Sequence, residues 1–402
     1  MKNKIAFILL IATLLTGCSQ QKDNDNNIVV DTLEVENKAE VNQTEEIEET
    51  ETTEEIENNT QETDNDTTTS VETEELITET QEIHVDTEET EEAEETELVD
   101  NSFDFDISFT GDVMIASFKG QVWDGSFSDY ANTKEPSYFF EDVKSYFESD
   151  DYTMVNLENV LTDNPLVEVG KNHNPAYWYK APTKYAEILT SSSIEAVSLS
   201  NNHTGDYGTQ GALDTQEALK NHNILYGSDS EVLYLEKNGY KVAIVCCGLW
   251  SQWNTSYIIN RLTEASNNSD FQVIFYHGGT ERVHTPEDWR VKASHDLVDA
   301  GADLVLGGHP HVLQPMEEYN GVRIIHSLGN FCFGGGSNEE NRTIIYKLRL
   351  NITDQELNNI EEEIVPCYVY KPGEKWKPAP IIDESERQKV IDFMSGKIDS
   401  PI

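Results

Sequence analysis

Five short apolar stretches in the later part of the chain each end in residues that can bind a metal or transfer a proton. These stretches lie at residues 103–110, 152–157, 194–199, 272–276 and 302–306. Their β-branched and aromatic content predicts strands, and amphipathic patterns between several of them predict helices. Strands that alternate with helices are typical of an α/β fold, in which functional residues follow the carboxyl ends of the strands.

The residues that follow these stretches form a mixed set of oxygen and nitrogen donors. They are Asp112, Glu158, Asn202 with His203, His277, and His309 with His311. Because strands of one sheet place their carboxyl ends at the same edge, we expect these side chains to converge. The set suits Mn²⁺, Fe²⁺ or Zn²⁺ better than Ca²⁺. Two neighbouring ions bridged by a carboxylate would use all the donors, whereas one ion would not.

Each of these histidines has a simpler interpretation when it is taken alone. Residues 307–311 could be a polar turn with two solvated imidazoles, and the Asn202-His203 pair could cap a helix. The agreement of five strand ends favours the metal site. For the other histidines we expect only structural roles; these are His84, His173, His222, His284, His295 and His326.

The N-terminal residues predict a secreted protein with a lipid anchor. Two lysines precede an apolar segment at residues 5–15, which is too short to span a bilayer but fits a secretory signal. The segment leads into Leu-Thr-Gly-Cys, which is similar to a bacterial lipoprotein box with Cys18 as the lipidated residue. We therefore expect residues 1–17 to be a signal peptide and the protein to be anchored at the extracytoplasmic face of the cell membrane. An ordinary cleaved signal is the alternative.

Residues 18–101 are expected to be a disordered acidic linker rich in Glu and Thr. Positions 21 to 101 contain 31 acidic residues, 2 basic residues and no aromatic residue. Such a segment cannot bury enough apolar surface to offset its chain entropy, and its charges repel one another. We interpret it as a solvated tether, with binding to a basic partner as the alternative.

Residues 102–402 form the expected folded domain. The 45 acidic and 23 basic residues of this part exclude nucleic-acid binding through a general basic patch. Helices are expected to begin near Ser137, Pro182 and Pro286 and to span residues 210–221. The cysteines lack zinc-ligand spacing and are interpreted as packing residues, with the adjacent pair on opposite faces of a strand. They are Cys246, Cys247, Cys332 and Cys367.

The polar motifs resemble those of the CapA family, the bacterial poly-γ-glutamate capsule biosynthesis proteins, which are related to the calcineurin-like metallophosphoesterases. The matching motifs lie at residues 109–114, 156–158, 200–208, 277–281, 307–315 and 327–331. The resemblance implies a four-layer α-β-β-α sandwich of two mixed sheets. It also implies a role in making or exporting an anionic polyglutamate polymer, with capsule synthase membrane subunits as possible partners.

The resemblance also implies a role for each residue of the site. The ligands of the two metals would be Asp112, Asn202, His277, His309, His311 and the bridging Glu158. Asp112 and His311 would serve one ion, and Asn202, His277 and His309 the other. His203 would act as the general acid near the leaving group. Glu281 and Asn330 are expected to contact the substrate.

Three positions depart from the patterns that this resemblance implies. Met114 stands where a phosphoesterase would have a histidine, so one metal would have fewer ligands. Gly278 replaces a tryptophan, and His326 replaces a tyrosine. These features leave two main hypotheses: a metal-dependent hydrolase or transferase acting on a phosphoester or a γ-glutamyl amide, and a non-catalytic component that handles the polymer in the same cleft. A surface adhesin has only the long tether in its favour.

Overall fold

The computed structural model describes residues 101–336 and 340–402. The predicted signal peptide, the lipidation site Cys18 and His84 lie outside the described residues, as does the acidic linker up to residue 100. Within the described ranges, no helix combines the length and the apolar character needed to cross a membrane.

The larger of two stacked sheets has antiparallel strands toward one edge and parallel strands from its middle to the other edge. In spatial order its strands are β17 (Ala379–Pro380), β16 (Glu356–Tyr368), β15 (Thr343–Thr353), β1 (Ser102–Met114), β3 (Tyr152–Leu157), β6 (Ala196–Ser198) and β7 (Leu225–Gly227), with β14 (Asn330–Phe333) paired to β1. The strands β1, β3, β6 and β7 run parallel to one another. Their carboxyl ends therefore share one end of the sheet.

The smaller sheet has parallel strands at its centre and one antiparallel strand at each edge. In spatial order its strands are β12 (Leu313–Tyr319), β13 (Val322–Leu328), β11 (Leu304–Gly308), β10 (Phe271–His277), β9 (Tyr240–Gly248) and β8 (Leu233–Lys237). The central four strands are parallel, and the two edge strands are antiparallel to their neighbours. A third sheet of short strands joins β2 (Ser117–Phe118), β5 (Tyr179–Ala181) and β4 (Val160–Leu161).

The two large sheets pack face to face through a buried apolar layer, and β9 shows how one strand serves two layers. Its residues Val242, Ile244 and Cys246 belong to the core between the sheets. The alternating residues Ala243, Val245 and Cys247 belong to the core on the outer face. The expectation for the adjacent cysteines is thus confirmed, because successive side chains of a strand point to opposite faces. All four cysteines of the described residues are buried and unbridged.

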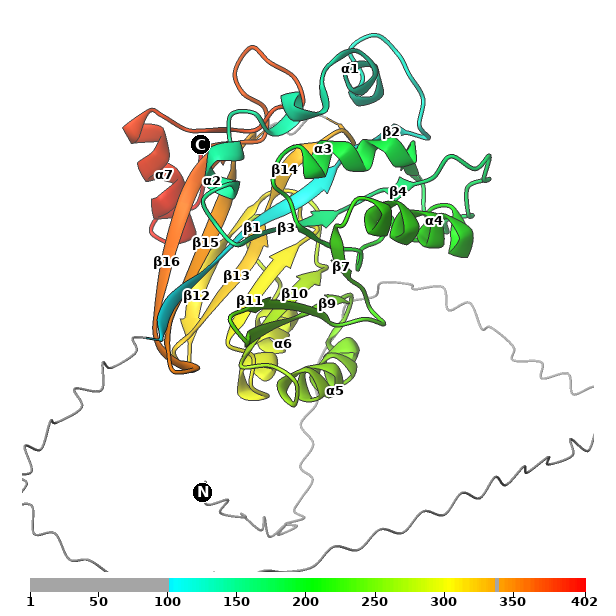
Figure 1. Ribbon diagram of the computed structural model, residues 1–402. Helices are drawn as coiled ribbons and strands as arrows, with labels where there is room; N and C mark the ends of the chain where they lie inside the picture. The colour runs from blue at the N-terminus through cyan, green and yellow to red at the C-terminus, as the bar shows by residue number, and fades with distance from the viewer. Residues whose placement is uncertain (1–100, 337–339) are drawn as a thin grey trace, which may run out of the picture. The chain divides into compact units, whose positions relative to one another are not determined.

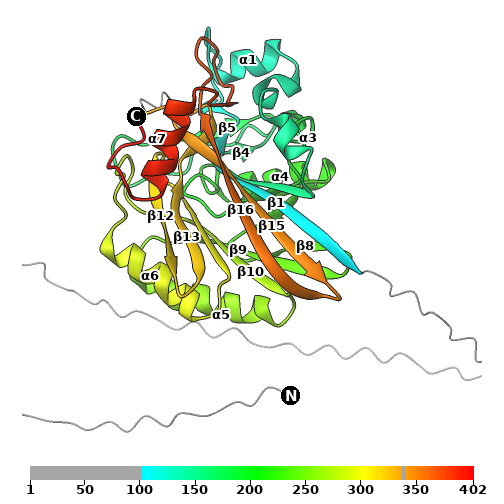
Figure 2. The same cartoon turned by 90° about the vertical axis from the view of Figure 1, so that its left-hand side faces the viewer.

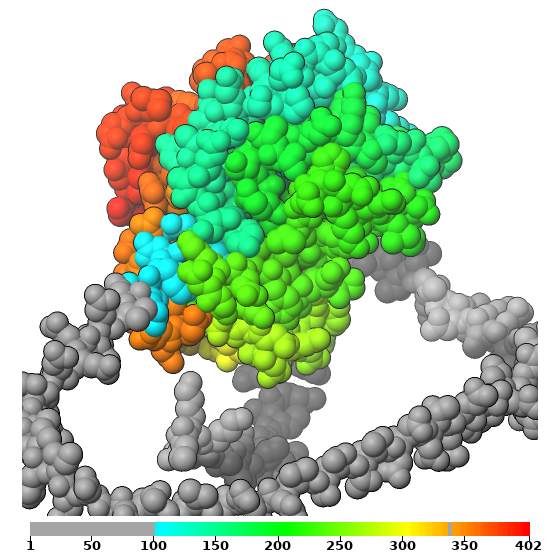
Figure 3. Space-filling model, in the orientation of Figure 1, coloured from blue at the N-terminus to red at the C-terminus, as the bar shows by residue number. Residues whose placement is uncertain are grey.

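Helices cover the outer faces of both sheets (Figures 1 and 2). On the larger sheet these are α1 (Phe127–Thr133), α2 (Lys144–Phe147), α3 (Ala186–Thr190) and α4 (Gly208–Asn221). On the smaller sheet they are α5 (Thr255–Ser266) and α6 (Asp288–Asp299), while α7 (Glu384–Met394) packs at the edge of the core between the sheets. In the space-filling view, the cyan and green segments close over the front of the molecule (Figure 3). The predicted four-layer α/β sandwich is confirmed.

Some elements differ from the prediction. The helix expected to begin near Ser137 is a 3-10 turn, Pro136–Phe140, followed by the single turn of α2. Further 3-10 turns lie at Thr183–Tyr185, just before α3, and at Gln252–Asn254, just before α5. The strand β16 was not predicted, because its first eight residues are exposed and show no apolar alternation. Backbone pairing with β15 holds it in place.

Candidate metal centre

The candidate site lies where the carboxyl ends of the two large sheets meet. Asp112 is in β1 and Glu158 follows β3, both in the larger sheet, whereas His277 ends β10 of the smaller sheet. The expectation that the donors share one sheet is therefore wrong, because they come from two stacked sheets. The approach is close: a Cβ atom added at Gly308 would lie 2.6 Å from Oδ1 of Asp112, so glycine is required there.

Asp112 is fully buried and is held by two hydrogen bonds. The side-chain amide of Asn156 donates to its Oδ1 at 2.8 Å, and the backbone N–H of His309 donates to its Oδ2 at 2.9 Å. Within the described residues it forms ion pairs only with imidazoles, those of His277 and His311. No lysine or arginine of this part of the chain neutralises it.

Glu158 is the second fully buried carboxylate, and neither of its oxygens has a hydrogen-bond partner in the described structure. Its Oε1 lies 3.5 Å from Nε2 of His277 and 3.9 Å from Nε2 of both His203 and His311. An unpartnered buried carboxylate is costly unless a positive charge lies beside it. The central position of Glu158 among the imidazoles fits a bridging ligand.

Three further donors converge beside Glu158. Nε2 of His277 lies 2.9 Å from Oδ1 of Asn202 and 3.1 Å from Nδ1 of His309. Ligand atoms that share one ion at about 2.1 Å lie roughly 2.9–3.4 Å apart in octahedral or tetrahedral geometry. The distances from Nε2 of His277 to the donor atoms of Asn202 and His309, and the 3.5 Å to Oε1 of Glu158, are close to this range. These residues therefore fit one divalent cation.

The donors for a second ion are fewer. Nδ1 of His311 lies 3.4 Å from Oδ2 of Asp112 and 2.8 Å from the amide oxygen of Asn330. A bond to Asn330 leaves Nε2 of His311 available on the side of Glu158. Met114 is buried in the core and offers no donor here. The structure also brings Glu158, His309 and His311 together, with ligand atoms within 4.8 Å of one another.

The loop that carries the two histidines has an uncommon backbone. His309 and His311 have φ values of 93° and 59°, in the region that normally favours glycine. Such conformations cost of order 1–3 kcal/mol each and persist where the surrounding structure fixes them. The two histidines flank Pro310, and this backbone turns both imidazoles toward the buried carboxylates.

The two buried carboxylates shift the pKa values of the histidines around them. Burial disfavours the charged form of His277, but the carboxylates of Glu158 and Asp112 outweigh it and raise the pKa to about 9. The same balance raises the pKa of His311 to about 10. Burial and the two charged imidazoles lower the pKa of His309 to about 2. Protonated imidazoles thus take the charge role that a cation would fill.

His203 lies at the edge of this cluster in a separate hydrogen-bonded group. Its Nδ1 lies 2.8 Å from Oδ2 of Asp206, and its Nε2 points toward Glu158. The other oxygen of Asp206 pairs with the ammonium group of Lys171 at 2.5 Å. The ring of Tyr179 packs edge-on against the imidazole. This arrangement fixes the ring with Nε2 facing the site, as a proton donor requires.

The remaining predicted residues lie around the cluster. Asn330 contacts His311, as described above, whereas Glu281 is exposed and forms no hydrogen bond or ion pair with the described residues. Five histidines expected to be structural lie outside the cluster, each bonded to a backbone carbonyl, a glutamate or both; they are His173, His222, His284, His295 and His326.

Sequence reasoning assigned no role to several residues that shape the site. Asn156 links Asp112 to Asn201, whose amide donates to Oδ1 of Asn156 at 3.0 Å. Trp250, after β9, places its ring 5.7 Å from that of His277 and 5.1 Å from that of His309. Position in a strand end could have suggested Asn156. Nothing in the local sequence marks Trp250, whose role depends on the neighbouring strand.

Comparisons with known proteins identify relatives of this chain. Residues 106–335 match the family described as bacterial capsule synthesis protein PGA_cap. The chain is 28% identical over 312 residues to the PGA biosynthesis protein CapA of Bacillus subtilis, covering 71% of this chain and 78% of that protein. It is 27% identical over 277 residues to the capsule biosynthesis protein CapA of Bacillus anthracis, covering 61% and 64% of the two chains.

One solved structure with a similar fold is the calcineurin-like phosphoesterase YfkN from Bacillus subtilis. It is 14% identical, with a TM-score of 0.37, and the alignment covers 65% of this chain and 90% of that chain.

Proposed function

Because the chain belongs to the bacterial capsule synthesis protein PGA_cap family, we propose that it acts in the synthesis or export of a poly-γ-glutamate capsule through a metal-dependent hydrolase site. One observation carries the chemical part of this proposal. Asp112 and Glu158 are fully buried, no lysine or arginine of the described residues pairs with them, and neutral or charged imidazoles surround them.

The residues that would hold the metal divide into two groups. Asn202, His277 and His309 would bind one ion, Asp112 and His311 the other, and Glu158 both. Oxygen and imidazole donors without sulfur suit Mn²⁺, Fe²⁺ or Zn²⁺. A divalent cation held there supplies Lewis-acid activation and a hydrolytic nucleophile at neutral pH.

The chain's own residues supply the proton and the orientation. His203, as the imidazolium, would donate the Nε2 proton to the leaving oxygen or nitrogen, and Asp206 would keep the other proton on Nδ1, so that the neutral ring is left as the Nδ1–H tautomer. Lys171 pairs with the second oxygen of Asp206 and so holds that carboxylate in place beside His203. Trp250 forms an apolar wall beside His277 and His309, which limits the access of water.

A non-catalytic role in polymer handling remains the second candidate. Met114 lies in the core where a further ligand would be needed, so the ion bound by Asp112 and His311 would be weakly held. A single cation could still attract the carboxylates of an anionic polymer to an otherwise acidic domain. Under this alternative, His203 would be dispensable.

The place of action in this proposal rests on the N-terminal sequence. Lipidation at Cys18 would anchor the protein at the outer face of the cytoplasmic membrane, and the acidic linker would hold the domain away from the lipid. Anchored capsule synthase subunits would then be within reach. Labelling with a lipid precursor, with a Cys18→Ser variant as the control, tests the anchor.

The hydrolase proposal is tested by metal content and activity measured on the same preparation. We expect at least one equivalent of metal per chain and hydrolysis of a phosphodiester or a γ-glutamyl oligomer that a chelator abolishes. His309→Ala should lose both, whereas Glu361→Gln on the exposed part of β16 should retain both. Metal binding without chelator-sensitive hydrolysis would support the polymer-handling role instead.

A further inference from the structure

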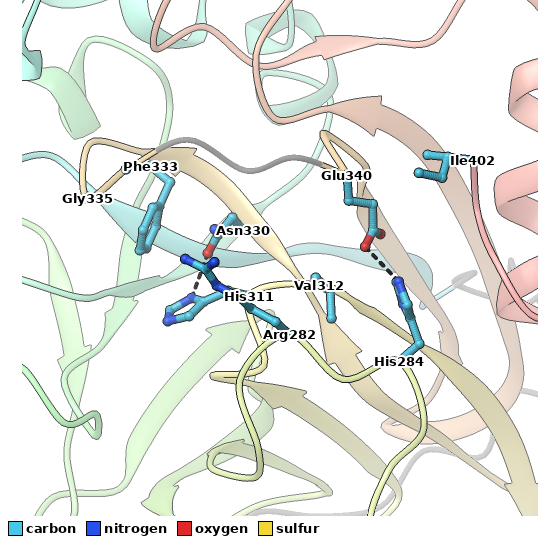
Figure 4. A pocket seen from close by; sticks show the side chains of 10 residues that line it. Arg282, His284, His311, Val312, Asn330, Phe333, Gly335, Glu340 and Ile402 are labelled. Carbon is cyan, nitrogen blue, oxygen red and sulfur yellow. Dashed lines mark hydrogen bonds and ion pairs between the residues drawn. The ribbon is translucent and has the colours of Figure 1, made fainter. Parts of the chain in front are cut away.

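A cavity of about 690 Å³ lies between α5 and α6, the two helices that cover the smaller sheet. These helices lie side by side (Figure 1). A different cavity, of about 310 Å³, is lined by His311 and so belongs to the metal centre already described (Figure 4). None of the residues that line the cavity between α5 and α6 is a candidate metal ligand. Its volume is within the range for ligand sites, and it is separate from the metal centre.

Trp253 lines this cavity with 91% of its surface exposed. It belongs to the 3-10 turn before α5, and a capping box of Ser251 and Asn254 closes this turn. The backbone N–H groups of Trp250 and Ser251 both donate to Oδ1 of Asn254, at 3.2 Å and 3.0 Å. These bonds fix the backbone that carries the indole ring. A large apolar ring held in water on a fixed backbone is typical of a binding surface, because a ligand that covers the ring removes it from water.

Neutral polar side chains stand next to this ring in the cavity. Gln252 lies in the same turn and Ser256 in the first turn of α5. Their side chains form no hydrogen bond with the described residues. The partly buried side chain of Ile259 adds an apolar part to the lining. The side of the cavity formed by α5 therefore offers an aromatic ring together with free donors and acceptors.

Two carboxylates at the end of α6 form the opposite side. Asp296 pairs with the ammonium group of Lys292 at 2.7 Å. Asp299 accepts hydrogen bonds from the hydroxyl group of Tyr319 at 3.2 Å and from the side-chain amide of Asn320 at 2.9 Å. Because a carboxylate has about four acceptor positions, both groups can accept further hydrogen bonds from a ligand.

The chemistry of this lining excludes several classes of ligand. The two carboxylates repel anions, in a domain that is already acidic. A cation would find one aromatic ring instead of a cage, and Lys292 already neutralises Asp296. A wholly apolar ligand would bury Gln252 and the carboxylates without partners. A neutral sugar ring fits all of these groups, because it has C–H groups on its faces and hydroxyl groups around its edge.

We propose that the cavity between α5 and α6 binds an uncharged oligosaccharide, with one sugar ring stacked on Trp253. Hydroxyl groups of the sugar donate to Asp296 and Asp299, and the amide of Gln252 bonds to a further hydroxyl group. This inference goes beyond the proposed function and does not depend on it, since no candidate metal ligand takes part. Such a site holds the domain on a glycan while the metal centre acts on its own substrate.

The test is calorimetric titration of the full chain with chitotetraose and, separately, with cellotetraose, which are uncharged chains of N-acetylglucosamine and of glucose. At least one of them should bind. Trp253→Ala should weaken this binding about tenfold or more, because the stacked ring is lost. A chelator should leave the affinity unchanged, since the site contains no metal ligand.

Three controls make the result specific. Trp253→Phe keeps a smaller ring and should lose less affinity than Trp253→Ala. Trp123→Ala removes another exposed tryptophan, which does not line the cavity, and should bind the sugar like the wild type. Because Trp253 is exposed, Trp253→Ala should also unfold at the same temperature as the wild type, so that a loss of binding is not a loss of fold.

Several results would overturn the inference. These are no binding of either oligosaccharide, equal affinity of the wild type and Trp253→Ala, and loss of binding on addition of a chelator, which would place the sugar at the metal centre. Tetralysine serves as the cationic comparison. If it binds in a manner that depends on Trp253 while neither sugar binds, the cavity takes a cation and the inference is wrong.

Discussion

Replacing Glu158 with glutamine should remove most of the stabilisation that a divalent metal gives to this protein. Glu158 is the donor that lies between both groups of candidate ligands, 3.5 Å from His277 and 3.9 Å from His311. Glutamine keeps the shape of the side chain but removes the charge and one ligand oxygen. The change therefore tests the ligand role with little effect on packing.

The size of the effect follows from binding linkage. Metal present at 100 times its Kd stabilises the folded state by about 2.7 kcal/mol. A folded domain of about 300 residues has an unfolding entropy of roughly 0.6 kcal/mol/K, so the Tm should rise by about 4 °C. Loss of even an indirect partner of a metal ligand weakens binding about 10–100-fold. A 100-fold loss at the same metal concentration leaves about 0.4 kcal/mol, or less than 1 °C.

The assay is calorimetric unfolding of the metal-free protein during titration with Mn²⁺ and then Zn²⁺. The wild type and the Glu361→Gln control should show the rise in Tm, and Glu158→Gln should not. The reasoning is refuted if Glu158→Gln shows the same rise as the wild type, or if no divalent metal shifts the Tm of the wild type.

Three other predictions concern single residues. Burial raises the pKa of Asp150 to about 7, so the folded protein keeps a proton that the unfolded chain releases near pH 4, and stability falls as the pH rises between these values. Asp150→Asn should remove this loss and be about 1–2 kcal/mol more stable at pH 8, allowing for partial exposure; parallel pH profiles of urea unfolding would contradict it. His203→Ala should lower kcat about 10²–10⁴-fold with unchanged metal content, and an equal loss of metal would show a structural role instead. Gly308→Ala should destabilise the fold by about 1–3 kcal/mol because its Cβ would meet Asp112, whereas Gly170→Ala, with no atom within 4 Å, should stay within about 0.5 kcal/mol.

The parts of the fold that the sequence predicted are those with strong apolar patterns. The runs that became β3, β10 and β11 are buried along nearly their whole length, so their composition marks them as strands. In contrast, β16 is exposed over its first eight residues and is held by backbone bonds to β15. Backbone pairing has no signature in side-chain pattern, and this strand could not be predicted.

The candidate site was predictable where each donor ends a strand. Asp112, His277 and the residues after β11 could be found in this way, and the structure brings them together. Their distribution over two sheets was not predictable, because a strand's sequence does not say which sheet it joins. The same holds for Asp206 and Trp250, whose contacts depend on loops that fold back onto the site.

The most direct test of the metal centre is anomalous diffraction from crystals of this protein grown or soaked with Mn²⁺. A peak should lie between Glu158, Asn202, His277 and His309, at about 2.0–2.3 Å from each ligand atom. A second, weaker peak is expected beside Asp112 and His311. If Mn²⁺ and Zn²⁺ both leave this position empty while binding elsewhere on the acidic surface, the buried carboxylates are not a metal site and the account is wrong.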